Sequence, residues 1–270
     1  DGNTVPFIAR YRKEMHGTMD DQTIRQLADR LAYLRGLDER RTEVRDAIDA
    51  QGKLTDELAA AIQEAQTLAA LDDLYRPYRP KRRTRASIAR EKGLEPLAAA
   101  ILAARAPSPS LEELAKPYIY PKKGVETAED ALAGAGDIIA EDLSDDANLR
   151  GHLRALLHRT GVLKTVGTDE DDTIYTMYHD FSEPVRRLQS HRVLAINRGE
   201  KEGKLKVALE ADENEAIAAV TRSALHPKNP FGDWLRAVCT DSWSRLLFPS
   251  LERELRSELT DAANEQAIRT

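Results

Sequence analysis

Apolar side chains recur every three or four residues along most of the chain, which is the spacing of one face of an α-helix. We expect a short helix from Thr4, a long helix from Thr18 to about Gln51, and a third from Thr55 to about Leu74. The apolar stripe of the long helix consists of Ile24, Leu27, Leu31, Leu34, Val44 and Ile48. Further helices are predicted from Ser110, from Thr127, over residues 146–161 and from Asp212, and residues 234–269 read as two helices separated at Pro249-Ser250.

Two stretches depart from the helical spacing. VLKTV (162–166) and KLKVALE (204–210) alternate or are β-branched, which predicts short strands. Between them lie the acidic GTDEDDT loop, the stretch YHDFSEP, and a helix SHRVLAIN closed by Arg198-Gly199. The whole pattern predicts a mainly α fold, a multi-helical elongated array with a helix-turn-helix-like unit and a small β component.

Composition supports this fold class. Aromatic residues make up 5% of the 270 residues and charged residues 32%, and the abundant alanine, leucine, glutamate and arginine favour helices. We expect three regions. They are an N-terminal helical region (1–75), a basic arm with a helix-turn-helix-like subdomain (76–160), and a mixed region with short strands and C-terminal helices (161–270).

Several classes of protein are excluded by what the sequence lacks. Cys239 is the single cysteine, so an internal disulfide framework or a multi-cysteine zinc site cannot form, and a reducing cytoplasm suits the chain. No run approaches the roughly 18 apolar residues of a membrane span, and no signal peptide is visible. We therefore expect a cytoplasmic protein without a membrane partner.

Positive charge is concentrated in LYRPYRPKRRTR (74–85), which we call the basic arm. Residues 76–92 contain eight Lys or Arg against the single acid Glu91, a net charge of +7 in a chain whose total is −6. Two tyrosines interleave with the cations, and two prolines stiffen the segment. Such a local excess indicates a site for polyanions, above all for phosphate backbones.

The segment after the arm has the spacing of two helices joined by a tight turn. Ala89 and Gly93 stand four residues apart, and the second helix opens at Glu95-Pro96. That helix offers leucine, alanine and isoleucine, and no Asn, Gln, Arg or Lys before Arg105. Because a helix that reads bases needs such donors, we interpret the pair as a packing unit, with a major-groove reader as the alternative.

We find no catalytic or cofactor constellation in the sequence. The six histidines include no pair at metal-ligand spacing on one face, and we expect them to lie at the surface or at helix caps. The acidic loop begins like a calcium site with Asp169 and Asp171, but Ile174 stands where glycine is required. Gly134 and Gly136 indicate close helix packing, and Cys239 a buried small side chain. We predict no enzyme, no cofactor and no small-molecule substrate.

Four blocks carry a family resemblance. TVPFIARYRKE (4–14), LYRPYRPKRRTRASIAREKGLEPLA (74–98), ALAGAGDIIAE (131–141) and HRVLAINRGEKEGKLKV (191–207) resemble the bacterial Tex family of transcription accessory proteins in order and spacing. The resemblance implies a longer protein with an N-terminal helical region, an RNase H-like module, helix-hairpin-helix elements and a C-terminal oligonucleotide-binding barrel as the main RNA-binding element. We expect this chain to be an N-terminal fragment that lacks a leading helix and ends near the start of the RNase H-like module.

Two functions remain open for the basic arm. In the first, the arm contacts nucleic acid, RNA rather than DNA, through phosphates and a tyrosine that stacks on a base or sugar. The predicted contacts are Arg76, Arg79, Lys81, Arg82, Arg83, Arg85, Tyr75 and Tyr78, and Arg10, Arg12 and Lys13 would extend the same face if the first helix packs beside the arm. In the second, the guanidinium groups pair with acids such as Asp72, Asp73 or those at 141–146. The arm then belongs to a scaffold that positions the RNA-binding domains or contacts the transcription machinery.

Overall fold

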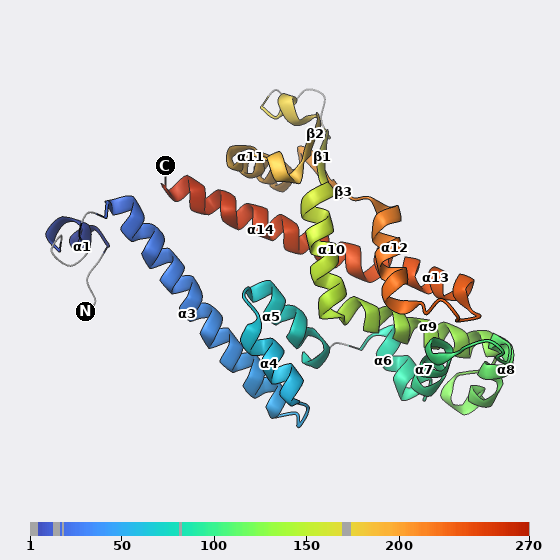
Figure 1. Cartoon of the computed structure of the whole chain (residues 1–270). Helices are drawn as coiled ribbons and strands as arrows, with labels where there is room; N and C mark the ends of the chain where they lie inside the picture. The colour runs from blue at the N-terminus through green and yellow to red at the C-terminus, as the bar shows by residue number, and fades with distance from the viewer. Residues whose placement is uncertain (1–4, 13–16, 18, 81–82, 169–173, 270) are drawn as a thin grey trace. The chain divides into compact units, whose positions relative to one another are not determined.

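The computed structural model describes residues 5–12, 17, 19–80, 83–168 and 174–269. Their contacts divide the chain into two compact units, residues 1–79 and residues 80–270 (Figure 1). We call them unit 1 and unit 2 and describe each by itself. The division falls inside the basic arm, after Arg79.

Unit 1 is a small helical unit built on one long helix. It contains α1 (Val5–Tyr11), α3 (Asp21–Asp49), α4 (Asp56–Glu64) and α5 (Leu68–Tyr75). The first turn of α3 is capped by the carboxylate of Asp20, which accepts the Thr23 N–H at 2.7 Å. The predicted start at Thr18 lies outside the described residues.

The core of unit 1 uses only part of the predicted apolar stripe. Leu37, Val44 and Ile48 of α3 are buried against α4 and α5, which fold back on the C-terminal half of α3 (Figure 1). In the N-terminal half of α3 three stripe residues stay open to solvent, with exposed fractions of 58%, 46% and 40% for Leu27, Leu31 and Leu34. The predicted apolar stripe is therefore not buried along its whole length within unit 1.

The predicted third helix is two helices. It breaks between Glu64 and Leu68, where Thr67 adopts an extended conformation and its hydroxyl accepts the Ala70 N–H at 3.1 Å. The carbonyl oxygen of Ala65 at the break accepts a hydrogen bond from the Arg41 guanidinium at 2.6 Å. Apolar periodicity does not detect this break, because both helices keep their apolar faces toward α3.

Replacing Thr67 with alanine is expected to lower the free energy of unfolding of unit 1 by about 1 kcal/mol, because α5 loses its N-cap. Thr42, inside α3, is the matched control, since its hydroxyl only bonds back to Asp38 O. Thr42→Ala is expected to be neutral or slightly stabilising. Urea unfolding followed by far-UV circular dichroism, with hydrogen exchange in α5, measures both. Stabilisation by Thr67→Ala would contradict the break.

Unit 2 begins with helices that surround α9. The helices are α6 (Arg85–Glu91), α7 (Glu95–Ala103), α8 (Leu111–Ala115), α9 (Ala128–Asp145) and α10 (Ala147–Thr160). The first three all pack on α9. The predicted starts at Ser110 and Thr127 are confirmed as capping boxes, and Thr84 forms a third with Ser87.

A three-stranded antiparallel sheet follows α10, in the order β2-β1-β3. It consists of β1 (Val162–Gly167), β2 (Asp180–Pro184) and β3 (Leu205–Glu210). The central strand pairs Leu163 with Glu183 on one side and with Leu209 on the other. The two predicted strands are confirmed. The edge strand β2 was not predicted, because DFSEP has no clear alternation and ends in a proline, which only an edge tolerates.

The helix α11 (Ser190–Lys201) packs against β3 and extends beyond its predicted end. Gly199 was expected to close it, but it lies inside the helix. A Cβ atom there would come within 2.6 Å of the Leu205 side chain and 3.0 Å of the Tyr175 ring. Glycine at this position therefore permits close approach of the sheet rather than ending the helix.

The last elements are α12 (Glu213–Ala224), α13 (Gly232–Asp241), a π-helical segment (Ser242–Leu247) and α14 (Phe248–Arg269). The predicted break at Pro249-Ser250 is wrong, because Pro249 is the second residue of α14, where a missing N–H is tolerated. The irregularity precedes it in the π-helical turns, where Trp243 is buried and Ser242 donates to Ala140 O at 2.7 Å.

A ladder of polar contacts joins α10 to α14. Arg150, Arg154 and His158, each four residues apart, face Ser250, Glu254 and Glu258 with the same spacing. Arg150 is completely buried and donates to Glu254 Oε1 at 2.6 Å, Ser250 Oγ at 3.1 Å and Ser144 O at 3.2 Å. The ladder fixes the register of the two helices.

The mainly α fold with a small β component is confirmed. Within the described ranges, no helix combines the length and apolar character required to cross a membrane.

Candidate nucleic-acid interface

The first half of the basic arm is folded onto unit 1. After α5, residues Arg76–Tyr78 form a 3-10 turn, and the Arg79 N–H donates to Tyr75 O at 3.0 Å. Gln51, just after the C-terminal end of α3, donates to Tyr78 O at 3.0 Å. Both tyrosines are half-buried and pack against the unit 1 core. The turn therefore presents its cations from a fixed backbone.

The Tyr75 ring makes cation–π contacts with two guanidinium groups of its own unit. The guanidinium carbons of Arg40 and Arg79 both lie 5.6 Å from the centre of its ring. Asp72 joins the same two arginines, at 2.8 Å to Arg40 Nη2 and 3.6 Å to Arg79 Nη2. A base that stacks on the Tyr75 ring would compete with these cation–π contacts.

The second half of the arm is more exposed. The Arg83 side chain is 71% exposed and forms a 3.4 Å ion pair with Glu91, which is itself exposed and therefore worth little. Arg85 is exposed at the start of α6 and forms no ion pair with any described residue. Lys81 and Arg82 lie outside the described residues. These cations remain available for an external phosphate.

Arg90, in the same basic segment, is a structural contact. Its guanidinium donates to Glu141 at 2.8 Å and to Asp142 at 2.5 Å, which ties α6 to α9. Burial raises the pKa of nearby Asp137, while Arg245 and Arg85 act in the opposite direction. One cation of the segment thus acts as the scaffold interpretation predicts.

The N-terminal cations do not extend the arm within unit 1. Figure 1 shows α1 beside the N-terminal end of α3, whereas the contact between Arg40 and Asp72 lies about 28 Å along the helix axis at 1.5 Å per residue. Arg10 and Arg12 are exposed there, and Lys13 lies outside the described residues. The condition under which they would join the arm is not met.

The pair α6–α7 is a packing unit. Leu94, Leu97 and Ile101 are buried, and Glu95, Pro96 and Ala99 face solvent. A Cβ atom on Gly134 of α9 would overlap the Leu94 side chain, so the predicted close packing at the glycine is confirmed. The exposed side of α7 has none of the donors that read base edges.

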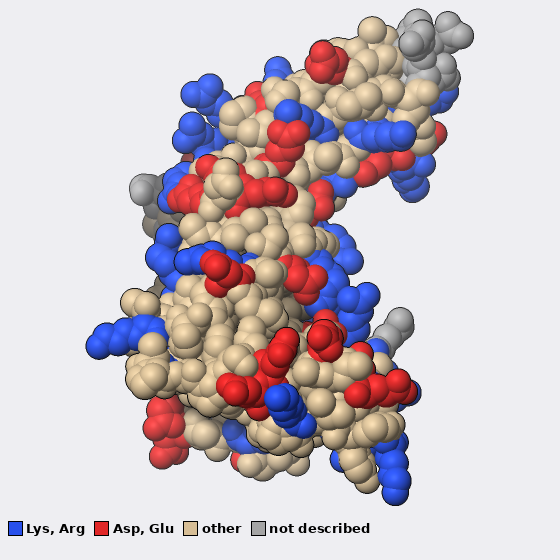
Figure 2. All heavy atoms as spheres, turned by 90° about the vertical axis from the view of Figure 1, so that its right-hand side faces the viewer, with Lys and Arg blue, Asp and Glu red and all other residues tan. Residues whose placement is uncertain are grey.

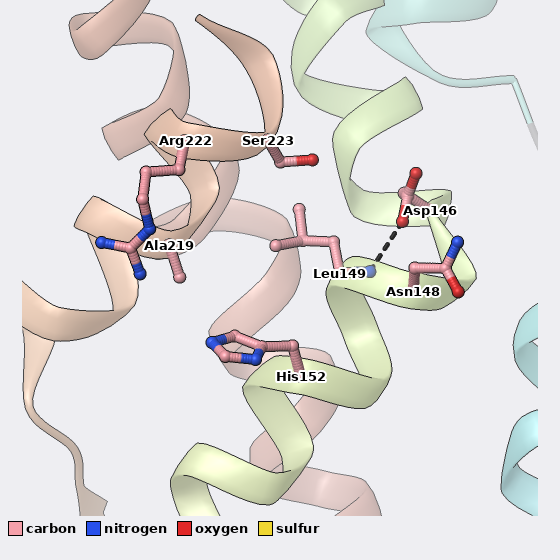
Figure 3. A pocket seen from close by; sticks show the side chains of 7 residues that line it. All are labelled: Asp146, Asn148, Leu149, His152, Ala219, Arg222 and Ser223. Carbon is pink, nitrogen blue, oxygen red and sulfur yellow. Dashed lines mark hydrogen bonds between the residues drawn. The ribbon is translucent and has the colours of Figure 1, made fainter.

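Two other residues that could carry chemistry, Asp146 and Cys239, have structural roles. A shallow pocket of about 360 Å³ lies between α10 and α12, where Leu149 and His152 of α10 lie across from Ala219, Arg222 and Ser223 of α12 (Figure 3). The Asp146 carboxylate in it caps α10 through the Leu149 N–H at 2.6 Å.

Cys239 is buried as predicted, and burial raises its pKa. The described residues contain no group of three or more acidic, histidine or cysteine side chains that could hold a metal ion. Asp169 and Asp171 lie outside them.

On the face shown in Figure 2, basic and acidic side chains are interspersed. Sequence comparison then decides the family. Residues 80–270 match the family described as "Tex central region-like", and residues 1–49 match the "Tex-like protein N-terminal domain". The chain belongs to the Tex family. The predicted resemblance is confirmed, and the matched central region of this Tex chain begins at the first residue of unit 2.

Relatives with descriptive names cover nearly the whole chain. It is 46% identical to "Protein tex" of Bordetella pertussis over 100% of its length, and 41% identical to "Transcriptional accessory protein Tex" of Neisseria gonorrhoeae over 99%. It is 30% identical to "S1 RNA-binding domain-containing protein 1" of Pongo abelii over 99%. The chain spans 36% of the two bacterial relatives and 28% of the third.

Proposed function

We propose that this Tex chain is the helical scaffold of a cytoplasmic transcription accessory factor that binds RNA, and that the basic arm adds a sequence-independent phosphate contact. The observation that carries the proposal is the exposure of Arg83 and Arg85 at the start of unit 2, where Arg85 forms no ion pair with a described residue. The names of the relatives, which refer to transcription and to an RNA-binding domain, agree with this role. No catalytic step is assigned to the chain.

A purely structural arm is the second candidate. It is favoured by the ion pairs of Arg90 with Glu141 and Asp142, and by the Arg40–Asp72–Arg79 group around Tyr75. In this case the arm holds helices in place, and the chain positions the RNA-binding domains of the full-length protein or contacts the transcription machinery. The two candidates differ in which cations matter, since Arg83 and Arg85 take little part in these contacts.

Replacing Arg82, Arg83 and Arg85 together with glutamine tests the proposal. Three lost phosphate contacts at about 0.7 each are expected to reduce the slope of log affinity against log salt by about 2 for single-stranded RNA. Fluorescence anisotropy over a salt series measures the slope. The matched control is Lys116, Lys122 and Lys123→Gln, which removes the same charge from exposed positions elsewhere in unit 2.

Stability is measured in parallel by tryptophan fluorescence, because both tryptophans, Trp234 and Trp243, lie in unit 2. We expect the arm variant and the parent chain to have the same unfolding midpoint. If it unfolds far below the parent while its residual binding keeps the parent's slope, the structural candidate is correct.

A further inference from the structure

A second basic segment of unit 2 has no role in the proposal so far. Residues 185–206 contain seven Lys or Arg against the two acids Glu200 and Glu202, a net charge of +5. The segment comprises the 3-10 turn Val185–Arg187, α11 and the start of β3. All of it lies within unit 2, on a described and regular backbone.

One side of α11 is fixed to α14 and the sheet. Val193 and Ile196 are buried. The polar residues of this side all have partners, because Asn197 donates to Thr260 Oγ1 at 2.8 Å, Ser190 bonds to Gln266, and Glu200 pairs with Arg256. This side therefore has a structural role.

The exposed side of α11 carries Arg198 and Lys201. At 100° per residue, Arg198 lies about 20° from the exposed His191 around the helix axis, and Lys201, in the last turn, lies about 60° from Arg198. All are exposed, as are Arg186 and Arg187 in the preceding turn. Within the described part of the chain, Arg186, Arg187, Arg198 and Lys201 form no ion pair. We call these four residues and His191 the α11 basic face.

The acids that could neutralise this face are engaged elsewhere. Glu183 of β2 pairs with Arg192 at 2.8 Å, Glu200 pairs with Arg256, and Glu202 accepts the Tyr175 hydroxyl at 2.9 Å. The exposed stretch from His191 to Lys201 is about 15 Å long, and its positive charge comes from Arg198 and Lys201. Fixed cations at this spacing match a chain of phosphates, and the half-buried Leu194 and Ala195 between them offer no donor to a base edge.

We propose that the α11 basic face contacts the phosphodiester backbone of a single-stranded nucleic acid, as a second site beside the arm. The inference rests on the proposed function, since it assigns a further contact to the same ligand. Within unit 2, Figure 1 shows α6 and α11 at opposite ends, with α9 and α10 between them. The two sites can therefore be tested separately.

The test is the variant Arg187→Gln/Arg198→Gln/Lys201→Gln in the full chain, because glutamine keeps the helix propensity. Binding of RNA and of DNA of the same sequence, about twenty nucleotides long, is measured by anisotropy over a salt series. We expect the slope to fall by about 2, and affinity to fall about a hundredfold at about 0.1 M salt, since that slope acts over a decade of concentration. An equal loss with both nucleic acids identifies the phosphates, and a loss confined to RNA adds the 2′-hydroxyl.

The lysine control of the arm experiment serves here too. An α11 variant that keeps the parent's slope overturns the inference, and so does a control that loses as much as the α11 variant. If only the arm variant has a reduced slope, the proposed function is supported and the α11 site is overturned. If only the α11 variant has a reduced slope, the α11 site is supported and the proposed phosphate contact of the arm is overturned. If the parent chain binds neither RNA nor DNA, both proposed contacts are overturned. An unchanged unfolding midpoint by tryptophan fluorescence shows that any loss is not misfolding.

Discussion

Replacing Arg150 with alanine is expected to lower the free energy of unfolding of unit 2 by about 3–5 kcal/mol, because one partner of a buried ion pair is removed. The side chain is completely buried, and its guanidinium joins Glu254, Ser250 and the carbonyl oxygen of Ser144. Truncation removes these hydrogen bonds and leaves a cavity where α10 meets α14.

Urea unfolding followed by tryptophan fluorescence measures this effect. Arg150→Met separates the loss of the ion pair from the effect of the cavity, since methionine fills much of the volume but makes no ion pair. Arg159, near the C-terminal end of the same helix, is the matched control. It pairs with Glu215 at 2.6 Å, but both side chains are exposed. Arg159→Ala is therefore expected to cost less than about 1 kcal/mol. Similar losses for the Arg150 and Arg159 alanine variants would contradict the buried placement of Arg150.

The second large effect is expected from Gly134→Ala, which should destabilise unit 2 by about 1–3 kcal/mol through overpacking. The new methyl group would overlap the Leu94 side chain and lie 3.3 Å from Ala89. Both neighbours are buried, so neither can move aside freely. Relief requires α6 and α7 to shift on α9, which also displaces Arg85.

Gly151→Ala is the matched control for this prediction. Gly151 lies in α10, and no heavy atom lies within 4 Å of the position of its added Cβ atom. The same change is therefore expected to stabilise unit 2 by about 0.5–1 kcal/mol through helix propensity. Opposite signs for the two substitutions, measured by urea unfolding, support the close contact at Gly134. Stabilisation by Gly134→Ala would exclude it.

Helix starts were predictable where a single side chain caps the helix. Ser110 and Thr127 each accept a backbone N–H three residues later, and Asp212 caps α12 in the same way. Such signals need no information from the rest of the chain, because every partner is local. The alternation in β1 and β3 is equally local.

Helix interruptions were not predictable from the same kind of pattern. Thr67 begins a new helix inside an apolar period that looks continuous, and Gly199 continues a helix that its type suggested should end. In each case a residue distant in sequence takes part, Arg41 at the first break and Tyr175 at the glycine. A pattern read along the chain does not contain these neighbours.

The candidate site also has features that the sequence predicts and features that only the tertiary structure shows. The sequence located the basic arm by its net charge, but it did not separate Arg90, which ties α6 to α9, from Arg83 and Arg85, which are exposed. The α11 basic face was not predicted from the sequence either. In this helix Arg198 and Lys201 are exposed whereas Glu200 pairs with Arg256, and charge counted along the sequence does not show which groups are paired.

The sequence by itself determined the helical class, the caps, two of the three strands and the family, because all of these depend on residue type and short spacing. Tertiary structure decided where apolar stripes stop being buried, why a glycine is needed at Gly199, and which cations lack an ion-pair partner among the described residues. These properties depend on contacts between segments such as α10 and α14, whose partner side chains lie about a hundred residues apart. Burial and ion pairing are set by such neighbours in space, and the order of residues alone does not specify them.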